Sequence, residues 1–290
     1  NFKIGGGFKE EKCKFFASVY PSDYVLKPGD LIVTMTDLSK TVDTLGYSAI
    51  VPNSKRIYLH NQRIGLINII NSTIVDKKYL YWLMRSPKYQ KTIAATSTGS
   101  TVHHTSPNRI YEYEFDLPQI SVQRKIAGIL SDIEEKINKN SAINNNLEEQ
   151  LSALFVNMFG HSIDSLDNSD IKLGDLIESV DNRGKTPPLS DEPTDYPIID
   201  VRALSGNSRI IDYTNCTKYV SKETYNNWFR SGHPKEYDIL ISTVGSLAEM
   251  KIFLGTIGCI AQNVVGFRTK GISPLYLYQY LNYIKNDLVA

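Results

Sequence analysis

The longest regular pattern of apolar positions lies in the middle of the chain, between Pro118 and Gly160. Apolar side chains recur there in alternating steps of four and three, and asparagines occupy two mid-stripe positions. No proline falls between the two ends, so the pattern predicts one helix of about 60 Å that begins near Pro118 and ends at Gly160. The stripe consists of Ile126, Leu130, Ile133, Ile137, Asn140, Asn144, Leu147, Leu151, Leu154 and Met158.

A strict heptad stripe of this length predicts a coiled coil, because an isolated helix would expose the stripe to water. Asn140 and Asn144 would weaken the helix contact but favour one register, since amides without partners are costly in an apolar seam. The alternative is a helix that lies on the chain's own domains.

Three blocks of similar sequence occur in the same order before and after this helix. The first is a polar turn with an apolar strand and a Ser/Thr-rich exit, the second an Asn/Gln pair before a strand, and the third a tyrosine-rich helix. The matched blocks are GDLIVTMTD (29–37) with YDILISTVG (237–245), HNQRIGL (60–66) with AQNVVGF (261–267), and YLYWLM (79–84) with YLYQYL (276–281). Their common order with drifting spacing predicts two copies of one domain.

Short strands with period-two alternation, such as residues 31–33 and 56–59, interleave with only a few helices. This pattern argues against a doubly wound parallel sheet and predicts an α+β (mixed α/β) fold, with a small mixed sheet and flanking helices in each domain. We expect one domain over residues 1–117, the coiled-coil helix over 118–160, and a related domain over 161–290.

The two copies are incomplete in opposite ways. Copy two opens with a lead-in at residues 171–201 that copy one lacks, and copy one closes with a segment at residues 97–120 that copy two lacks. We therefore expect the chain to start and stop inside domains. Truncation, processing, a sequence limited to ordered residues, or circular permutation would each produce this arrangement.

The net charge of +1 hides an uneven distribution. Residues 1–117 carry 15 Lys+Arg against 10 Asp+Glu, residues 118–159 carry 4 against 5, and residues 160–290 carry 13 against 16. Bulk charge therefore gives no argument for nucleic-acid binding, which would need local patches.

The cysteines and the apolar runs indicate where the protein resides. Cys13, Cys216 and Cys259 are odd in number and follow no metal-ligand spacing, so we expect free thiols in a reducing compartment. No secretory segment and no apolar run long enough to cross a bilayer occur, so we expect a soluble, cytoplasmic protein without a membrane partner.

Together, these segments resemble the specificity subunits of type I restriction-modification systems, and the resemblance covers essentially the whole chain. The family has two target recognition domains, each followed by a long spacer helix, and the two spacers pack antiparallel. The matching segments are GDLIVT, STGST, LPQISVQRKIAGILSDIEEKI, LGDLIES, GKTPP, DYPIID and YDILIST. Only one spacer is present here, so its partner helix would come from missing sequence or from a second copy of the chain.

The resemblance implies recognition of double-stranded DNA at two half-sites, together with methyltransferase subunits and a restriction (motor endonuclease) subunit. Base edges are read by side chains with directed donors and acceptors on loops of a rigid scaffold. In copy one the candidates are Asn61, Gln62, Arg63, Ser97, Thr98, Gly99, Ser100, Thr101 and His103, and in copy two they are Arg183, Lys185, Ser242, Thr243, Ser246, Gln262 and Asn263.

Each candidate group has a structural alternative. The Asn/Gln pairs could cap strands or bond to backbone, and residues 99–101 could form a simple turn. The tyrosines of the two tyrosine-rich helices are expected to pack in cores rather than to stack on bases.

No catalytic, metal or cofactor site is predicted. Residues 184–186 (GKT) lack the first glycine of a phosphate-binding loop and are followed by two prolines. His103 and His104 are adjacent and would point to opposite faces of a strand, which disfavours chelation of one metal. We find no methyltransferase or nuclease motif, so we expect a non-catalytic subunit. The alternatives are the specificity module of a single-chain restriction-modification enzyme and a protein-binding structural adaptor.

Overall fold

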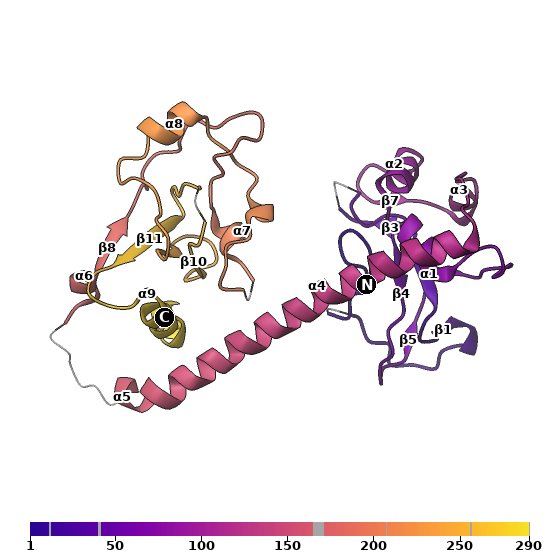
Figure 1. Ribbon diagram of the computed structural model, residues 1–290, viewed down its shortest axis with the longest axis horizontal. Helices are drawn as coiled ribbons and strands as arrows, with labels where there is room; N and C mark the ends of the chain where they lie inside the picture. Colours follow the sequence, from indigo (N-terminus) through magenta and orange to yellow (C-terminus); the bar gives the residue numbers. More distant parts are fainter. Residues whose placement is uncertain (12, 40–41, 165–170, 207, 256, 290) are drawn as a thin grey trace. The chain divides into compact units, whose positions relative to one another are not determined.

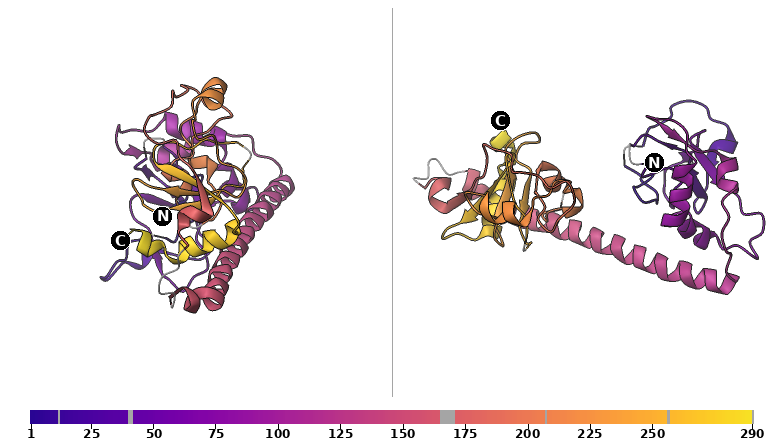
Figure 2. Two further views of the ribbon diagram at one scale, coloured as in Figure 1. Left: turned by 90° about the vertical axis from the view of Figure 1, so that its left-hand side faces the viewer. Right: turned by 90° about the horizontal axis from the view of Figure 1, so that it is seen from above.

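A computed structural model describes residues 1–11, 13–39, 42–164, 171–206, 208–255 and 257–289. The chain forms two compact units, Asn1–Asn138 and Lys139–Ala290, which are described separately. Helix α4, Ile120–Phe155, is unbroken and runs from the first unit into the second (Figures 1 and 2). The expected mixed α/β fold with one long helix is confirmed.

The first unit is built on a three-stranded antiparallel sheet with the order β4-β2-β6. Two short antiparallel ribbons, β1 with β5 and β3 with β7, adjoin it. The strands are β1 Val25–Leu26, β2 Leu31–Thr34, β3 Thr36–Asp37, β4 Ser48–Ile50, β5 Tyr58–Leu59, β6 Ile64–Ile67 and β7 His103–His104. The helices are η1 Ser22–Tyr24, α1 Lys77–Leu83, α2 Pro87–Ala95 and α3 Pro107–Tyr111.

The second unit is built on a four-stranded antiparallel sheet with the order β10-β9-β11-β8. The strands are β8 Ile177–Val180, β9 Ile239–Ser242, β10 Met250–Ile252 and β11 Val264–Thr269. The helical segments are η2 Val156–Gly160, α5 His161–Asp164, α6 Leu173–Leu176, α7 Val201–Leu204, η3 Tyr213–Asn215, α8 Lys222–Asn227, α9 Pro274–Tyr283 and α10 Lys285–Val289.

The two sheets share one topology, which confirms the repeat predicted from the sequence. The central strand β2 has the same antiparallel neighbours as β9, so that β4 corresponds to β10 and β6 to β11. Helix α1 follows β6 as α9 follows β11, and each begins at a side-chain cap, Asp76 or Ser273. The additional strand β8 comes from the lead-in that only copy two contains.

The prediction of period-two alternation over residues 31–33 is wrong. All four residues of β2 are buried, as are all four of β9. Ile32 packs into one apolar cluster with Leu26 and Val51, and Val33 packs into another with Leu45. A central strand covered on both faces has no solvent side, so its apolar residues run continuously.

The turn before each central strand has the same hydrogen bonds in both units. Asp30 accepts a hydrogen bond from the N–H of Lys27 at 2.7 Å, and Asp238 accepts one from Lys235 at 2.8 Å. The third turn residue is left-handed in both, with φ of 86° at Gly29 and 69° at Tyr237. The same turn is therefore built with glycine in one copy and with a residue that disfavours this conformation in the other.

Substitution of Gly29 by Ala should lower the free energy of unfolding by about 1 kcal/mol, because the added Cβ disfavours positive φ although it meets no atom within 4 Å. Gly128→Ala is the matched control, since its Cβ also meets nothing within 4 Å but lies inside helix α4. That change should raise stability by about 0.5 to 1 kcal/mol. Denaturant unfolding of both variants measures this, and shifts of the same sign would contradict the assignment.

The long helix does not end at Gly160, and that prediction is wrong. Helical turns continue through η2 and α5 to Asp164. Gly160 is buried, and a Cβ there would lie 3.5 Å from the hydroxyl oxygen of Tyr283. That distance is an ordinary van der Waals contact, so Gly160 neither ends the helix nor is required by a close neighbour.

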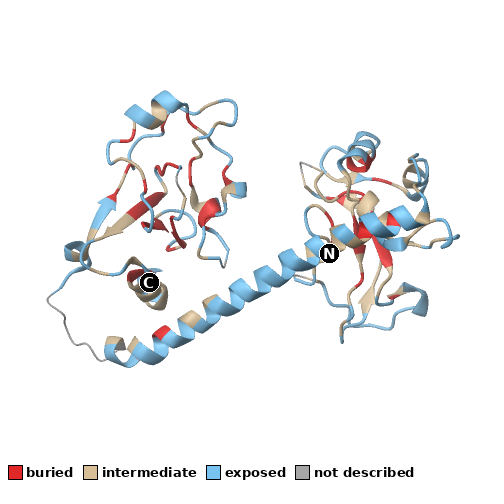
Figure 3. Cartoon of the chain, viewed as in Figure 1, coloured by how far each residue is buried: buried red, intermediate tan, exposed pale blue. Residues whose placement is uncertain are grey.

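The predicted seam of α4 lies mostly at the surface of the chain. Much of the helix is exposed (Figure 3). Among the stripe residues the exposed fraction is 37% at Ile126 and 65% at Met158, and Asn140 and Asn144 are exposed, whereas Leu130 and Leu151 are partly buried. The buried residues of α4 are Gln123, Ala127 and Phe155, and Gln123 continues the heptad of the stripe three residues before Ile126. Packing of the helix on its own units therefore covers only part of the stripe, and the coiled coil stays a prediction.

A buried glutamine fixes the start of α4 to the first unit. The side chain of Gln123 is fully buried and makes three hydrogen bonds. Its Oε1 accepts from the N–H of Asp76 at 2.9 Å, and its Nε2 donates to the carbonyls of Ile74 at 2.8 Å and Pro118 at 2.7 Å.

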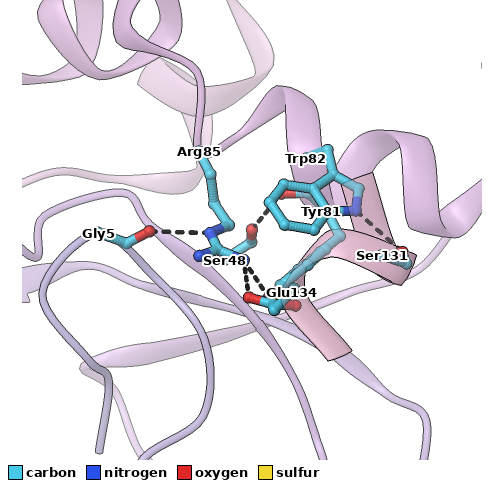
Figure 4. Close-up of polar contacts among 7 residues, drawn as sticks. All are labelled: Gly5, Ser48, Tyr81, Trp82, Arg85, Ser131 and Glu134. Carbon is cyan, nitrogen blue, oxygen red and sulfur yellow. Dashed lines mark hydrogen bonds and ion pairs between the residues drawn. The ribbon is translucent and has the colours of Figure 1, made fainter. Parts of the chain in front are cut away.

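Two turns further on, a polar cluster links α4 to α1 (Figure 4). Arg85 forms an ion pair of 2.6 Å with Glu134, and the Tyr81 hydroxyl donates to the same carboxylate at 3.1 Å. The indole N–H of Trp82 donates to Ser131 at 3.1 Å. Burial raises the pKa of Tyr81 against the opposing effect of Arg85, so this phenol stays a hydrogen-bond donor. Helix α4 is thus mounted on this unit through directed contacts at several turns.

Candidate nucleic-acid interface

In the first unit, the two predicted contact segments meet at the exit of β2. The N–H of Met35 donates to the carbonyl of Arg63 at 2.8 Å, and the carbonyl of Met35 accepts from the N–H of Thr105 at 3.0 Å. The Asn61–Arg63 turn and the hairpin that carries residues 98–104 therefore flank one strand end. Segments separated by about 40 residues in the sequence are adjacent in space.

In the second unit, the predicted segments also converge on one sheet edge. Strands β8 and β9 both run antiparallel to β11, so the ends of β8 and β9 lie beside the start of β11. The N–H of Thr243 donates to the carbonyl of Asn263 at 2.9 Å, and Nε2 of Gln262 donates to the hydroxyl of Thr186 at 2.7 Å. The edges that carry the candidates are thus equivalent in the two units.

The strand register corrects the sequence alignment of the Asn/Gln pairs by one residue. Ile64 pairs with Thr34 at the end of β2, and Val264 pairs with Ser242 at the end of β9. Gln62 therefore corresponds to Gln262, and Arg63 to Asn263. The glycines of HNQRIGL and AQNVVGF, which the sequence alignment superposes, occupy neighbouring positions on opposite faces of their strands.

Several candidate side chains are already bonded within their loops. Asn61 accepts a hydrogen bond from the N–H of Arg63 at 2.9 Å, which is a local turn of the kind that the structural alternative describes. Ser242 is buried, donates to the carbonyl of Ser246 and accepts from the N–H of Glu249 at 2.9 Å. Gln62, Arg63, Lys185, Ser246 and Gln262 are exposed at the two edges.

The segment at residues 97–101 forms the turn that the structural alternative predicts. Thr98 and His104 exchange backbone hydrogen bonds of 3.0 and 2.8 Å. Gly99 has φ of 100°, and a Cβ there would lie 2.0 Å from the carbonyl oxygen of Val102. Ser100 and Thr101 remain exposed at its tip.

The two adjacent histidines have different surroundings. Nδ1 of His104 lies 3.2 Å from the hydroxyl of Thr36, whereas Nδ1 of His103 is buried without a hydrogen-bond partner in the described part of the chain. Among the described residues, no group of three His, Cys, Asp or Glu side chains is arranged to hold a metal ion.

A buried carboxylate organises the exit of β2. Asp37 accepts hydrogen bonds from the N–H groups of Ser39 and Thr44, each at 2.6 Å, and of Leu45 at 3.0 Å. Burial raises the pKa of Asp37, but the bonds from Ser39 and Thr44 outweigh burial and leave the pKa below its usual value. Its contribution to stability is therefore present above the unfolded pKa and is lost as pH falls through the folded value.

Sequence reasoning missed residues that hold the loop after β8. Asn182 is buried, donates through Nδ2 to the carbonyl of Gly232 at 2.9 Å, and accepts at Oδ1 from the N–H of Ser231 at 2.9 Å. Arg230 donates to the carbonyl of Arg183 at 2.7 Å. These contacts span about 50 residues and have no sequence signal, whereas the Asp-x-Arg spacing of Asp181 and Arg183 is visible in the sequence.

The cysteines do not add chemistry to either edge. Cys13, Cys216 and Cys259 are free thiols. Burial raises the pKa of Cys216 to about 11 and that of Cys259 to about 12. The two buried thiols therefore stay protonated near neutral pH and are not activated nucleophiles.

The type I restriction modification DNA specificity domain matches residues 4–149, half of the chain. The chain belongs to this family. Within the family, the chain is 32% identical over 115 residues to the type I restriction enzyme MjaIX specificity subunit of Methanocaldococcus jannaschii. The matched part is 40% of this chain and 26% of the relative, so the match spans about a quarter of the curated relative.

One solved specificity subunit shows the same fold as this chain. The S subunit of the type I restriction-modification system from M. genitalium superposes with a TM-score of 0.51 at 17% identity, covering 96% of this chain and 71% of that one. The HsdS subunit from Thermoanaerobacter tengcongensis covers 93% of this chain and 67% of its own length, at 17% identity and a TM-score of 0.35. Among the described residues of this family member, no helix is both long and apolar enough to cross a membrane.

Gln62→Ala and Asn263→Ala should each relax discrimination in one half-site of the target, by about 1 to 3 kcal/mol if the lost contact is bidentate. Both residues lie at the equivalent sheet edges. Asn68→Ala is a control, because Asn68 is exposed just beyond the opposite end of β6. Binding to a duplex library with single base-pair changes measures the effect. Unchanged preference in both edge variants would remove these two residues from the interface.

Proposed function

We propose that this chain is the DNA recognition subunit of a type I restriction-modification complex. It reads a target of two half-sites, one through each unit, and directs methylation and cleavage that partner subunits carry out. The observation that carries this proposal is the duplication of one sheet edge. In each unit, exposed polar side chains lie where the central strand ends. The chain also belongs to the DNA specificity family.

The chemistry of the two edges supports base reading. Directed donors and acceptors such as Gln62 and Gln262 are the groups that distinguish base pairs in the major groove. They lie on turns anchored by strands, which is the arrangement that recognition needs. The positive charge near them is local, so phosphate attraction would position the duplex rather than provide the specificity.

We propose that the catalytic work lies with methyltransferase subunits and a restriction (motor endonuclease) subunit, and that this chain contributes no catalytic residue and no cofactor. The exposed stripe on α4 would then bind a second helix, supplied by residues outside this chain or by a second copy. The exposed isoleucines and leucines on either side of Asn140 and Asn144 support such a contact, because they would otherwise remain in water.

Salt titration of DNA binding separates this function from that of a protein-binding adaptor. The chain, isolated with the partners it binds, should prefer one bipartite duplex over a scrambled duplex of the same length. Its affinity should fall steeply as salt rises, because phosphate contacts release counterions. Binding that ignores both the sequence and the salt concentration would overturn the proposal and favour the adaptor.

A further inference from the structure

The loop that follows β8 contains Arg183, whose backbone and side chain are both held by hydrogen bonds. The carbonyl of Arg183 accepts a hydrogen bond from Arg230 at 2.7 Å. The preceding residue, Asn182, is buried, and its side-chain amide is bonded to residues 231 and 232. Ser231 also donates to the carbonyl of Asp181 at 2.6 Å. Gln262 holds the far end of the loop through Thr186. The backbone of Arg183 is thus tied on both sides.

The guanidinium of Arg183 is oriented by one carboxylate. Nε donates to Oδ1 of Asp181 at 3.0 Å, and Nη2 donates to Oδ2 at 2.7 Å. This bidentate pair uses the edge formed by Nε and one Nη2 hydrogen. Within the described part of the chain, the Nη1 hydrogens and the second Nη2 hydrogen make no further hydrogen bond. The outer edge of the guanidinium is therefore available as two parallel donors.

We propose that Arg183 reads a guanine in the half-site of the second unit, with Asp181 as the residue that positions it. Two parallel N–H donors match the O6 and N7 acceptors that guanine presents in the major groove. This inference rests on the proposed DNA-recognition function and adds the base and the groove. The location agrees with it, because the loop lies at the sheet edge where β8 and β9 end and β11 begins.

A guanine fits this arginine better than a backbone phosphate does. The carboxylate of Asp181 offsets the positive charge of the guanidinium and would repel a phosphate at close range. Directed hydrogen bonds to a neutral base edge lose less from this neutralisation than contact with a phosphate does, and the pair with Asp181 preserves the geometry of the donors. Holding the side chain in advance also lowers the entropy lost when the base is bound.

A second Asp-x-Arg pair in the same unit provides a matched control. Arg202 donates through Nη2 to Asp200 at 3.1 Å and to the hydroxyl of Thr217 at 2.7 Å. Both Nη2 hydrogens are therefore used, and this arginine lacks a free outer edge. Arg202→Ala removes the same charge from the same unit without removing a bidentate donor.

The test measures binding of the full chain with its partner subunits to duplexes that carry every single base-pair change. Arg183→Ala should abolish the preference for G·C at one position, which means losing an affinity ratio of about 5- to 150-fold over the other base pairs. Arg202→Ala should leave every base preference in place. Asp181→Asn should weaken the same position partially, and the double variant Asp181→Asn/Arg183→Ala should equal Arg183→Ala alone. At that position, 7-deazaguanine should bind more weakly than guanine, because it keeps O6 but lacks the N7 acceptor, and inosine, which keeps both acceptors, should bind normally.

Two outcomes would overturn the inference while leaving the proposed function intact. One is an unchanged base preference in Arg183→Ala. The other is a uniform loss across all duplexes with a smaller salt slope, which would mark a phosphate contact. A wild-type chain without any base preference would instead overturn the proposed function itself, so the two failures are distinguishable.

Discussion

Deletion of residues 140–146 from α4 is expected to change the length of the unread gap between the two half-sites and to leave the bases of each half-site unchanged. All seven residues are exposed, and the deletion removes one heptad, so the seam stays in phase. The helix shortens by about 10 Å, which equals at most about three base-pair steps. Mapping of methylated sites in cells that carry the variant measures the new gap.

The control for the deletion is a duplication of the same seven residues, which should change the gap in the opposite direction. Altered bases with unaltered spacing would contradict the role of α4 as a spacer. A second contradicting result is the loss of all methylation while hydrogen exchange shows that both units are still folded. That result would mean that the helix does more than set the distance between the two units.

Gln123→Leu should lower the free energy of unfolding of the first unit by about 3 kcal/mol. The substitution removes the partner of the N–H of Asp76 and of the carbonyls of Ile74 and Pro118, in hydrogen bonds that are partly buried. Each such group costs about 1 to 3 kcal/mol, although local relaxation reduces the total. Hydrogen exchange of the amides of α1, compared between variant and wild type, reports the loss in this unit alone.

Gln119→Leu is the matched control, because Gln119 is exposed one turn earlier. It should change stability by no more than about 0.5 kcal/mol. If the amides of α1 are equally protected from exchange in both variants, then the buried carboxamide of Gln123 does not hold α4 on the first unit. The attachment of α4 would then depend on the Arg85–Glu134 cluster instead.

Much of the fold follows from the sequence because each copy repeats the same pattern. The central strands and the tyrosine-rich helices lie where the patterns predict them, and so does the long helix apart from its C-terminal end. Tyr81 and Tyr278 are buried, as expected for core residues, although Tyr79 and Tyr276 are only partly covered. A pattern that occurs in both copies is a stronger predictor, because a wrongly assigned element would have to be wrongly assigned in both copies.

Register and termini were less predictable. The shared glycine of the second block shifted the alignment by one residue, since sequence similarity does not report which residue faces which across a sheet. Gly160 resembled a helix end, but the helical turns continue past it to Asp164. The alignment error arose because strand register depends on contacts between residues far apart in the sequence.

The candidate interface, like the fold, was predictable from the sequence only in part. The sequence identified the polar segments, but only the backbone bonds of Met35 and Thr243 show that they share a strand end in each unit. It also could not show that Ser242 is buried or that Arg183 is paired with Asp181. The heptad stripe was visible from its period alone, whereas a helix that covers it would lie outside the chain.

Mapping of methylated bases in three strains tests the central account most directly. The strains carry the wild-type chain, a first-unit variant Gln62→Ala/Arg63→Ala, and a second-unit variant Arg183→Ala. The account predicts a two-part target in the wild type, with relaxed bases in one part for the first variant and in the other part for the second. A continuous target, or changes in the same part for both variants, would contradict it.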